Sequence, residues 1–163
     1  MLLQPGTAAP DFELAATPTT TLRLRDLRGQ RVILAFYPAD WSPVCGDEMA
    51  LYNQTLSLFE PYQARLLGIS VDSQWCHQAF AESRHIHFPL LADFEPKGQV
   101  SRAYGAYDEA GGYSQRALFV LDEAGIIRWS YLSPEDQNPG ADGILDALDA
   151  LPPAQQPQAL ERV

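Results

Sequence analysis

The chain has 163 residues, 46% of them hydrophobic and 20% charged, with a formal net charge of −10 and a pI near 4.5. This length and composition are typical of one folded domain, and no apolar stretch is long enough to span a bilayer. The acidic balance disfavours nucleic acids and membranes as partners, because phosphate binding needs clustered positive charge. The N-terminus has neither a basic start nor an apolar run, and there are only two cysteines. We therefore expect a cytoplasmic protein whose thiols react rather than cross-link.

The first half of the chain alternates between predicted strands and helices. Residues 9–14 and 19–24 alternate apolar and polar or are β-branched, so we expect two short edge strands. Residues 31–37 form a nearly continuous apolar run, which is typical of a strand buried on both faces of a parallel sheet. Residues 38–43 interrupt this run with two prolines. From Val44, apolar residues at helical spacing predict a helix to about residue 60.

A second strand and helix follow the same pattern. Residues 66–71 are again almost entirely apolar and predict a buried strand. Asp72 or Ser73 can cap the next helix. We expect the inner face of that helix to carry Trp75, Ala79 and Phe80.

The second half of the chain contains shorter elements. Residues 88–91 are predicted to be extended, and residues 97–104 to form a short helix. Residues 117–121 and 126–131 flank Asp-Glu-Ala-Gly, a strong hairpin signal. A closing helix is predicted over 144–151. The sequence therefore predicts one α/β domain over residues 1–151, with a central mixed sheet flanked by helices and an N-terminal β extension; residues 152–163 are predicted to be a flexible tail.

The most specific motif lies where the first buried strand meets its helix. Pro38, Ser42 and Cys45 follow the pattern of a proline, three residues, a serine or threonine, two residues and a cysteine. This segment resembles the active-site segment of peroxiredoxins, which have a thioredoxin-like fold, and its style is closest to the bacterioferritin-comigratory and one-cysteine bacterial subgroups. Four further segments are similar to the family at matching places: residues 9–12, 70–73, 88–93 and 116–122. The chain departs from the family at Ser42, where threonine is commoner, and at Gly46, where threonine is frequent.

The position of Cys45 also suits peroxide chemistry on physical grounds. It lies in the first turn of a predicted helix, where unpaired N–H groups and the helix dipole favour an anion. A helix N-terminus or a nearby cation lowers the pKa of a cysteine from about 8.5 to roughly 3.5–7.5. The resulting thiolate can attack one oxygen of a peroxide and become a sulfenic acid. Ser42 can cap the helix and donate its hydroxyl to the sulfur or to the peroxide.

The resemblance implies roles for further residues. Arg116 would be the fixed cation that stabilises the leaving oxygen, Glu48 would orient this arginine, and Pro38 would shield the pocket from water. From the sequence alone, Arg116 also fits a surface strand position. The implied substrates are hydrogen peroxide and small organic hydroperoxides, without cofactor or metal. The reductant would be thioredoxin or a low-molecular-weight thiol, and the protein a monomer or a homodimer.

Other classes of function remain open at this point. A thioredoxin-like disulfide oxidoreductase usually has a second cysteine three residues after the first, and here that position is Glu48. A non-catalytic interaction module with the same fold is also open, since a fold does not determine a function. A zinc site built from Cys76, His77, His85 and His87 is disfavoured. Cys76 and His77 are adjacent on a helix and point in different directions, and the two other histidines lack a matching second pair.

Cys76 has two open interpretations. It is the only other thiol that can condense with a Cys45 sulfenic acid, and it lies at the start of the second helix. Two helix starts of one sheet edge are neighbours, but a disulfide needs Cα atoms within about 7 Å, so local unwinding would be required. Alternatively, Cys76 packs beside Trp75 and Phe80 while an external thiol resolves Cys45. In the reduced protein we expect the two sulfurs not to be bonded.

Overall fold

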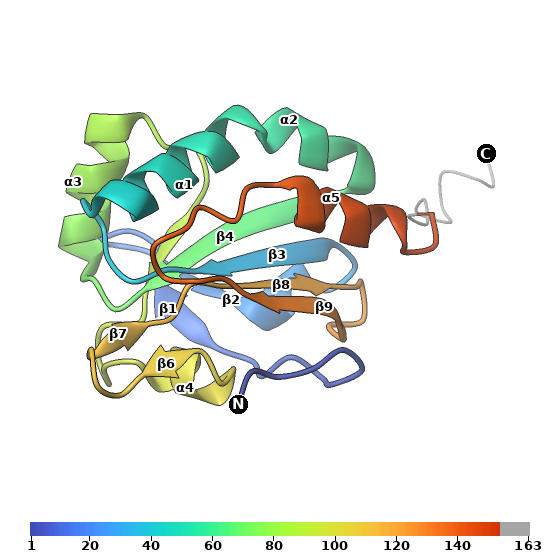
Figure 1. The fold of residues 1–163 in the computed structure, drawn as a ribbon, viewed down its shortest axis with the longest axis horizontal. Helices are drawn as coiled ribbons and strands as arrows, with labels where there is room; N and C mark the ends of the chain where they lie inside the picture. The colour runs from blue at the N-terminus through green and yellow to red at the C-terminus, as the bar shows by residue number, and fades with distance from the viewer. Residues whose placement is uncertain (154–163) are drawn as a thin grey trace.

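The structure is a computed structural model that describes residues 1–153, so most of the predicted tail lies outside the described residues. Figure 1 shows a central sheet with several helices on one face and a short helix and small hairpin on the other. The strands are β1 (Glu13–Ala15), β2 (Thr21–Arg23), β3 (Arg31–Phe36), β4 (Ala64–Ser70), β5 (Leu90–Ala92), β6 (Tyr107–Asp108), β7 (Tyr113–Ser114), β8 (Ala117–Leu121) and β9 (Ile127–Leu132). The helices are α1 (Pro43–Gln54), α2 (Leu56–Phe59), α3 (Gln74–Arg84), α4 (Gln99–Ala103) and α5 (Asp142–Asp149), with 3-10 turns η1 (Leu24–Leu27) and η2 (Glu60–Tyr62).

A 7-stranded mixed sheet organises the molecule, in the order β2-β1-β5-β4-β3-β8-β9. β3 is parallel to β4, and β4 is parallel to β5, whereas the pairs β1–β2, β3–β8 and β8–β9 are antiparallel. The predicted α/β class is confirmed, including the mixed sheet and the N-terminal β extension. Because β3 and β4 run parallel, α1 and α3 both start at the same edge of the sheet, beyond the carboxyl ends of these strands.

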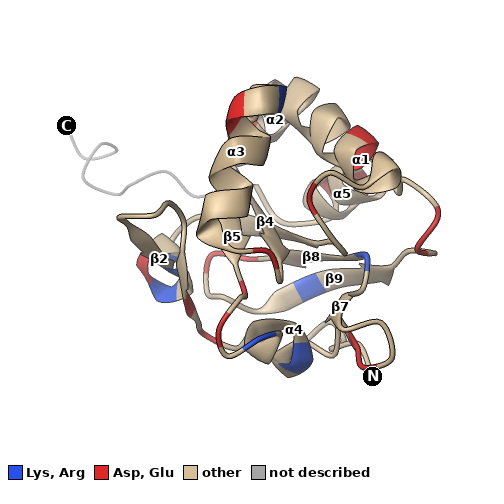
Figure 2. Ribbon diagram, turned by 90° about the vertical axis from the view of Figure 1, so that its left-hand side faces the viewer, with Lys and Arg blue, Asp and Glu red and all other residues tan. Residues whose placement is uncertain are grey.

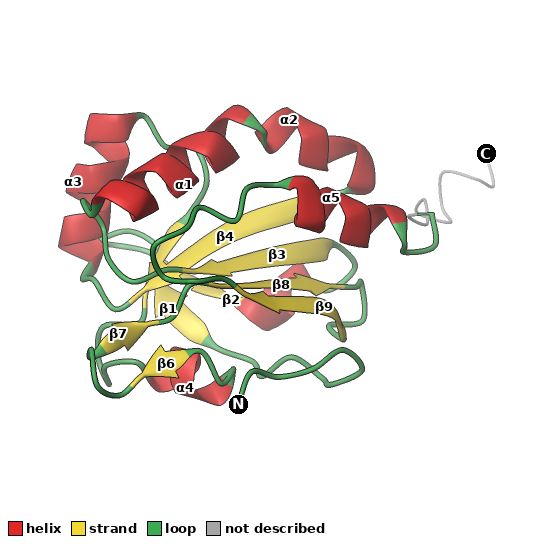
Figure 3. Cartoon of the chain, in the orientation of Figure 1, coloured by secondary structure: helices red, strands yellow, loops and turns green. Residues whose placement is uncertain are grey.

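The central strands bury side chains on both faces of the sheet. On β3, Ile33 and Ala35 pack with residues of α1, α3 and α5, and Leu34 and Phe36 pack with residues of α4 and the N-terminal segment. Figure 3 shows the same division, with α1, α2, α3 and α5 over one face and α4 on the other. This two-sided burial explains why the strand sequence is continuously apolar rather than alternating.

The helix predicted from Val44 to about residue 60 is wrong in its length. α1 ends at Gln54, and the chain continues through the separate turns α2 and η2. At the break, the hydroxyl of Thr55 donates to the carbonyl oxygens of Leu51 and Tyr52, both at 3.1 Å. A hydroxyl bonded to the preceding turn competes with the backbone ladder, so the regular helix stops there.

The predicted inner face of α3 is also wrong in part. Phe80 is buried as expected, but Trp75 is 64% exposed and Ala79 is exposed as well. The second buried residue is instead His77, which precedes Phe80 by three positions. At 100° per residue, Trp75 lies about 140° around the helix from Phe80 and therefore faces solvent. Because histidine is polar, the pattern of apolar residues did not indicate that His77 lies on the buried face.

Two smaller differences concern the strands. β2 is an edge strand as predicted, but β1 lies inside the sheet between β2 and β5. The hairpin of β6 and β7 was not predicted, because each strand has only two residues and shows no periodicity. The predicted hairpin of β8 and β9 is present.

The charges of the described residues are dispersed. Figure 2 shows Lys and Arg positions spread over several elements, including β2, α4 and β9, with Asp and Glu positions among them. This arrangement lacks the gathered positive charge that nucleic acid binding uses. Among residues 1–153, no helix combines the length and hydropathy needed to cross a bilayer.

Candidate active site

The start of α1 fixes the position of Cys45. Pro43 occupies the first helical turn, where its missing N–H is not needed, and Ser42 is the N-cap. The backbone N–H of Cys45 donates to Ser42 Oγ at 3.4 Å, so the serine hydroxyl hydrogen is free to donate elsewhere. Cys45 is fully buried in the third position of the helix, directly beyond the end of the central strand β3.

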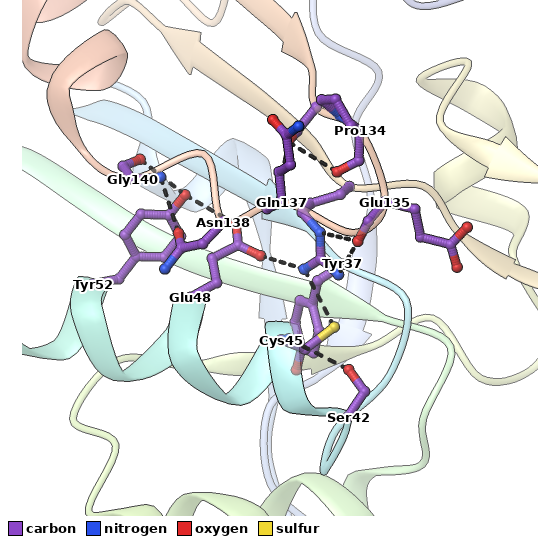
Figure 4. A network of polar contacts seen from close by, with 12 residues as sticks. Tyr37, Ser42, Cys45, Glu48, Tyr52, Pro134, Glu135, Gln137, Asn138 and Gly140 are labelled. Atoms are coloured by element: carbon purple, nitrogen blue, oxygen red, sulfur yellow. Dashed lines mark hydrogen bonds and ion pairs between the residues drawn. The ribbon is translucent and has the colours of Figure 1, made fainter.

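Arg116 faces the sulfur of Cys45. Its Nη1 donates to Cys45 Sγ at 3.3 Å and to Glu48 Oε1 at 2.7 Å. Figure 4 labels Cys45 and Glu48 on the same helix and marks the polar contacts of both side chains with dashed lines. The side chains of Arg116 and Glu48 are 2% and 0% exposed, so this ion pair is out of contact with bulk water. The guanidinium therefore places a fixed positive charge against the thiol, one turn of helix from its carboxylate partner.

Neighbouring residues hold the other donors of Arg116. Its Nε and Nη2 donate to the carbonyl oxygen of Glu135 at 3.1 and 2.8 Å. Tyr52 lies one turn after Glu48 and donates its hydroxyl to Glu48 Oε2 at 2.9 Å. Burial lowers the pKa of Arg116, but the bonds and charges of Cys45 and Glu48 outweigh this effect, so its pKa is above the usual value. Arg116 is thus a permanent cation in a defined orientation.

Burial also sets the acidity of the carboxyl and phenol groups here. Burial raises the pKa of Glu48, and the hydrogen bonds and charge of Arg116 partly counter this effect. Burial and the Glu48 carboxylate raise the pKa of Tyr52 well above its usual range, so the phenol remains a hydrogen-bond donor. The network is therefore held by one cation, one carboxyl group and one neutral phenol.

A hollow of about 570 Å³ opens beside this network. Its lining comes from the loop between β3 and α1, the first turn of α1, the strand β7, the link from β7 to β8 and the loop after β9. These residues are Pro38, Ala39, Ser42, Pro43, Val44, Tyr113, Arg116, Glu135 and Asp136. A small molecule in this hollow would meet the Ser42 hydroxyl and the Arg116 guanidinium next to the buried sulfur of Cys45.

Cys76 occupies a different environment at the start of α3. Both cysteines are free, as expected for the reduced protein. The backbone N–H of Cys76 donates to Ser73 Oγ at 3.2 Å, and its Sγ lies 3.9 Å from Asp72 Oδ1. Desolvation raises the pKa of Cys76 to about 11, and the charges of Asp40 and Asp72 add to this effect. Cys76 is therefore a neutral thiol near pH 7.

The histidines and carboxylates do not form the group of Cys76, His77, His85 and His87 that a zinc site would need. His85 is the left-handed C-cap of α3 and is exposed, as is His87, so neither joins His77. Within residues 1–153, the residues that bring ligand atoms together are Asp40, Asp72 and His77, all within 4.8 Å of one another. Their atoms are already engaged in hydrogen bonds, as with His77 Nδ1, which contacts Asp40 Oδ2 at 2.6 Å. This cluster is a closed polar network rather than an open ligand set.

Sequence reasoning missed several members of the site. Tyr52 could have been found from its spacing, since it lies four residues after Glu48 on the same face of one helix. The carbonyl oxygens of Glu135 and Gly140, which accept bonds from Arg116 and Tyr52, have no signature because any residue supplies a carbonyl. Tyr113 comes from the unpredicted hairpin.

These features define a class of protein: a thioredoxin-like sheet in which the central strand leads to a helix-capped cysteine beside a buried arginine. The AhpC/TSA family profile matches residues 5–130. The chain is 36% identical over 151 residues to alkyl hydroperoxide reductase E of Mycobacterium tuberculosis, covering 92% of this chain and 99% of that protein. It is 34% identical over 161 residues to peroxiredoxin tpx1 of Schizosaccharomyces pombe, covering 93% and 83%.

Solved structures agree with the sequence comparisons. Reduced 2-Cys peroxiredoxin of Plasmodium vivax superposes with a TM-score of 0.83 at 28% identity, covering 91% of this chain and 81% of that one. Peroxidoxin BcpB of M. tuberculosis superposes with a TM-score of 0.82 at 30% identity, covering 92% and 99%. The chain belongs to the AhpC/TSA family of peroxiredoxins and is a thiol-dependent peroxidase.

Proposed function

We propose that Cys45 is the nucleophile of this peroxidase and reduces hydrogen peroxide and small organic hydroperoxides. The observation that carries the proposal is the 3.3 Å contact of Arg116 Nη1 with Cys45 Sγ beside the hollow. The thiolate attacks one peroxide oxygen and the O–O bond breaks. Cys45 becomes a sulfenic acid, and the second oxygen leaves as hydroxide or alkoxide and takes up a proton. Arg116 stabilises the negative charge that moves from sulfur to the leaving oxygen.

The other residues of the site position these groups. Ser42 caps α1 and donates its free hydroxyl hydrogen to the thiolate or the bound peroxide. Pro38 is buried in the wall of the hollow and excludes water from it. Glu48, held by Tyr52, fixes the plane of the Arg116 guanidinium and does not contact the substrate. This division of roles follows from which atoms line the hollow and which lie behind it.

A hydroperoxide with a small organic group suits the dimensions of the site. The hollow of about 570 Å³ exceeds what hydrogen peroxide alone needs, and apolar residues such as Pro38, Pro43 and Val44 form part of its wall. The name of the mycobacterial relative, an alkyl hydroperoxide reductase, supports the same substrate class.

Cys76 or an external thiol completes the cycle. Attack of the Cys76 thiol on the Cys45 sulfenic acid forms a disulfide and releases water, and thioredoxin or a low-molecular-weight thiol then reduces the product. In the alternative cycle, an external thiol attacks Cys45 directly. We place this activity in the cytoplasm, in a monomer or homodimer.

A stopped-flow measurement with hydrogen peroxide and with cumene hydroperoxide tests the nucleophile. The reduced protein should react with each at a rate far above that of a free thiol, whereas Cys45→Ser should not react. A rate equal to that of free cysteine would contradict the proposal. After one equivalent of peroxide, mass spectrometry should find a Cys45–Cys76 disulfide within one chain. A persistent sulfenic acid with alkylatable Cys76 would instead identify the external thiol as the resolving group.

A further inference from the structure

A buried polar pair lies behind the active-site loop and has no part in the peroxide step. His77 of α3 and Asp40 of the loop between β3 and α1 are 2% and 0% exposed in their side chains. His77 Nδ1 contacts Asp40 Oδ2 at 2.6 Å, and His77 Nε2 contacts the carbonyl oxygen of Leu91 at 3.1 Å. Tyr37 donates its hydroxyl to Asp40 Oδ1 at 2.7 Å.

The partners of this pair determine its proton count. A carbonyl oxygen only accepts, so Nε2 of His77 must carry a hydrogen. Asp40 Oδ1 already accepts from Tyr37, whose hydroxyl stays protonated because burial and then Asp40 raise its pKa well above its usual value. One further proton must therefore lie between Nδ1 and Oδ2, which would otherwise be two acceptors at 2.6 Å. The pair is a charge-assisted hydrogen bond with no net charge, a strong contact in a buried setting.

The groups around the pair bind the same two segments together. Asp72, in the turn before α3, accepts from the backbone N–H of Asp40 at 2.8 Å. Cys76 lies beside Asp72 and is the residue next to His77 in the chain. On the outer side, the rings of Trp41 and Phe80 meet edge to face with centroids 5.2 Å apart. These hydrogen bonds and the ring contact therefore hold the loop that leads to Ser42 and Cys45 against the helix that carries Cys76.

We propose that the Asp40–His77 pair is a latch that holds the catalytic loop against α3 and sets how often the first turns of α1 and α3 open. The closed latch keeps Ser42 and Cys45 in the geometry that reacts with peroxide. The open latch lets the two helix starts unwind toward each other. Its consequence for catalysis rests on the proposed resolution of Cys45 by Cys76: the latch limits the rate of disulfide formation and thereby the lifetime of the sulfenic acid.

Two substitutions at one position test the latch. Asp40→Ala removes the loop half of the pair, and neutral His77 keeps its bond to Leu91 and has the Tyr37 hydroxyl 3.4 Å from Nδ1. Asp40→Asn is the matched control, since its amide can donate to neutral His77 while its oxygen accepts from Tyr37. Amide hydrogen exchange of the reduced proteins, followed by mass spectrometry, reports opening without any redox step. His77→Leu breaks the pair from the other side, should Asp40→Ala fold poorly.

We expect exchange of peptides covering residues 38–45 and 73–80 to rise at least tenfold in Asp40→Ala. In Asp40→Asn it should stay within about threefold of the wild-type protein. Peptides from β8 should exchange as before in all of them, which separates latch opening from general destabilisation. Equal exchange of both segments in Asp40→Ala and the wild-type protein would overturn the latch, however Cys45 is resolved.

Stopped-flow tryptophan fluorescence tests the link to catalysis, because Trp41 and Trp75 lie in the two joined segments. Because the closed state remains the major one even in Asp40→Ala, the peroxide-dependent phase of this variant should stay within threefold of the wild-type rate. The later, peroxide-independent phase should be at least fivefold faster. If amide exchange rises but the later phase is no faster than in the wild-type protein, the latch does not limit disulfide formation. If the wild-type protein forms no disulfide, the resolving role of Cys76 fails, and the exchange result alone decides the latch.

Discussion

The starts of α1 and α3 have the same local structure and opposite surroundings. Each begins with a serine N-cap and has a cysteine three residues later, Ser42 and Cys45 in α1 and Ser73 and Cys76 in α3. In both helices the backbone N–H of the cysteine donates to the serine oxygen, at 3.4 and 3.2 Å. The helix dipole and the serine cap are therefore alike at the two cysteines, although Pro43 gives α1 one free N–H fewer than α3 has.

The charges brought by other elements distinguish the two thiols. Cys45 faces Arg116, which is 71 residues away in the chain. Cys76 faces the carboxylates of Asp72 and Asp40, and its pKa is raised to about 11, first by desolvation and then by these charges. A helix N-terminus alone thus does not make a reactive cysteine. In the proposed mechanism, the charged neighbour of each thiol decides which of the two similar helix starts attacks peroxide.

Replacing each cysteine by serine in turn should give the largest difference in activity between the two helix starts. Cys45→Ser should abolish peroxide turnover, because no second thiol faces a cation in the described residues. Cys76→Ser should leave the rate of the peroxide step within about twofold, since Cys76 does not line the hollow. Stopped-flow kinetics with hydrogen peroxide measures both. Comparable losses in the two variants would mean that the two thiols are not distinguished in this way.

Removing the Arg116 cation should make Cys45 less reactive toward peroxide, because neither thiol would then face a cation within the part of the chain that the structure describes. We expect Arg116→Met to slow the peroxide step by about 10²–10³-fold, the usual effect of losing one donor to a developing oxyanion. The substitution also leaves Glu48 as an unpaired buried group, so the combined variant with Glu48→Gln is the necessary control. Arg84→Met, at an exposed arginine over Trp41, should keep the wild-type rate. Full activity of Arg116→Met with Glu48→Gln would show that another cation serves Cys45.

Neutralising a carboxylate beside Cys76 should have the opposite effect and make this thiol more reactive. With its pKa raised to about 11, Cys76 is a thiolate in only about one molecule in a thousand at pH 8. In a Cys45→Ser background, iodoacetamide should therefore alkylate Cys76 slowly, with a rate that rises about tenfold per pH unit toward pH 11. Asp72→Asn should speed alkylation at pH 8 by about three- to tenfold, because desolvation, the largest cause, remains. An unchanged rate would assign the raised pKa to burial and to Asp40, without a contribution from Asp72.

How much of the structure can be predicted from the sequence depends on how far apart in the chain the interacting residues lie. The buried strands and the Ser42 cap follow from local pattern, and the structure contains both. The inner face of α3 could not be predicted from hydrophobicity, because the residue buried beside Phe80 is His77, whose partner Asp40 is 37 residues away.

The position of Arg116 lies between these cases. The strand that follows it was predicted from local pattern, but nothing in residues 113–121 indicates that this arginine points at a cysteine on another element. Only the resemblance to peroxiredoxins indicated it. The carbonyl oxygen of Glu135, which holds two of its nitrogens, depends on a loop conformation that has no side-chain signature. Long-range polar contacts are thus the part of the site that the sequence alone does not reveal.

The smallest expected effect concerns a glycine that only one of the two helix starts possesses. Gly46 follows Cys45 in the first turn of α1, whereas His77 follows Cys76 in α3. A Cβ at Gly46 would meet Arg84 Nη1 at 3.1 Å, the far end of an exposed, flexible side chain that can move aside. Alanine is favoured over glycine within a helix by roughly 0.5–1 kcal/mol, so Gly46→Ala should make opening of this turn about two- to fivefold rarer.

Gly46→Ala therefore asks which helix start opens during resolution. If α1 must unwind for Cys45 to meet Cys76, disulfide formation after one equivalent of peroxide should slow by the same two- to fivefold, with the peroxide step unchanged. Amide exchange should slow at residues 43–47 and not at residues 74–78, which provides the internal control. A disulfide rate equal to that of the wild-type protein, together with slower exchange in α1, would show that α3 alone opens. The two serine-capped turns would then differ in mobility as well as in charge.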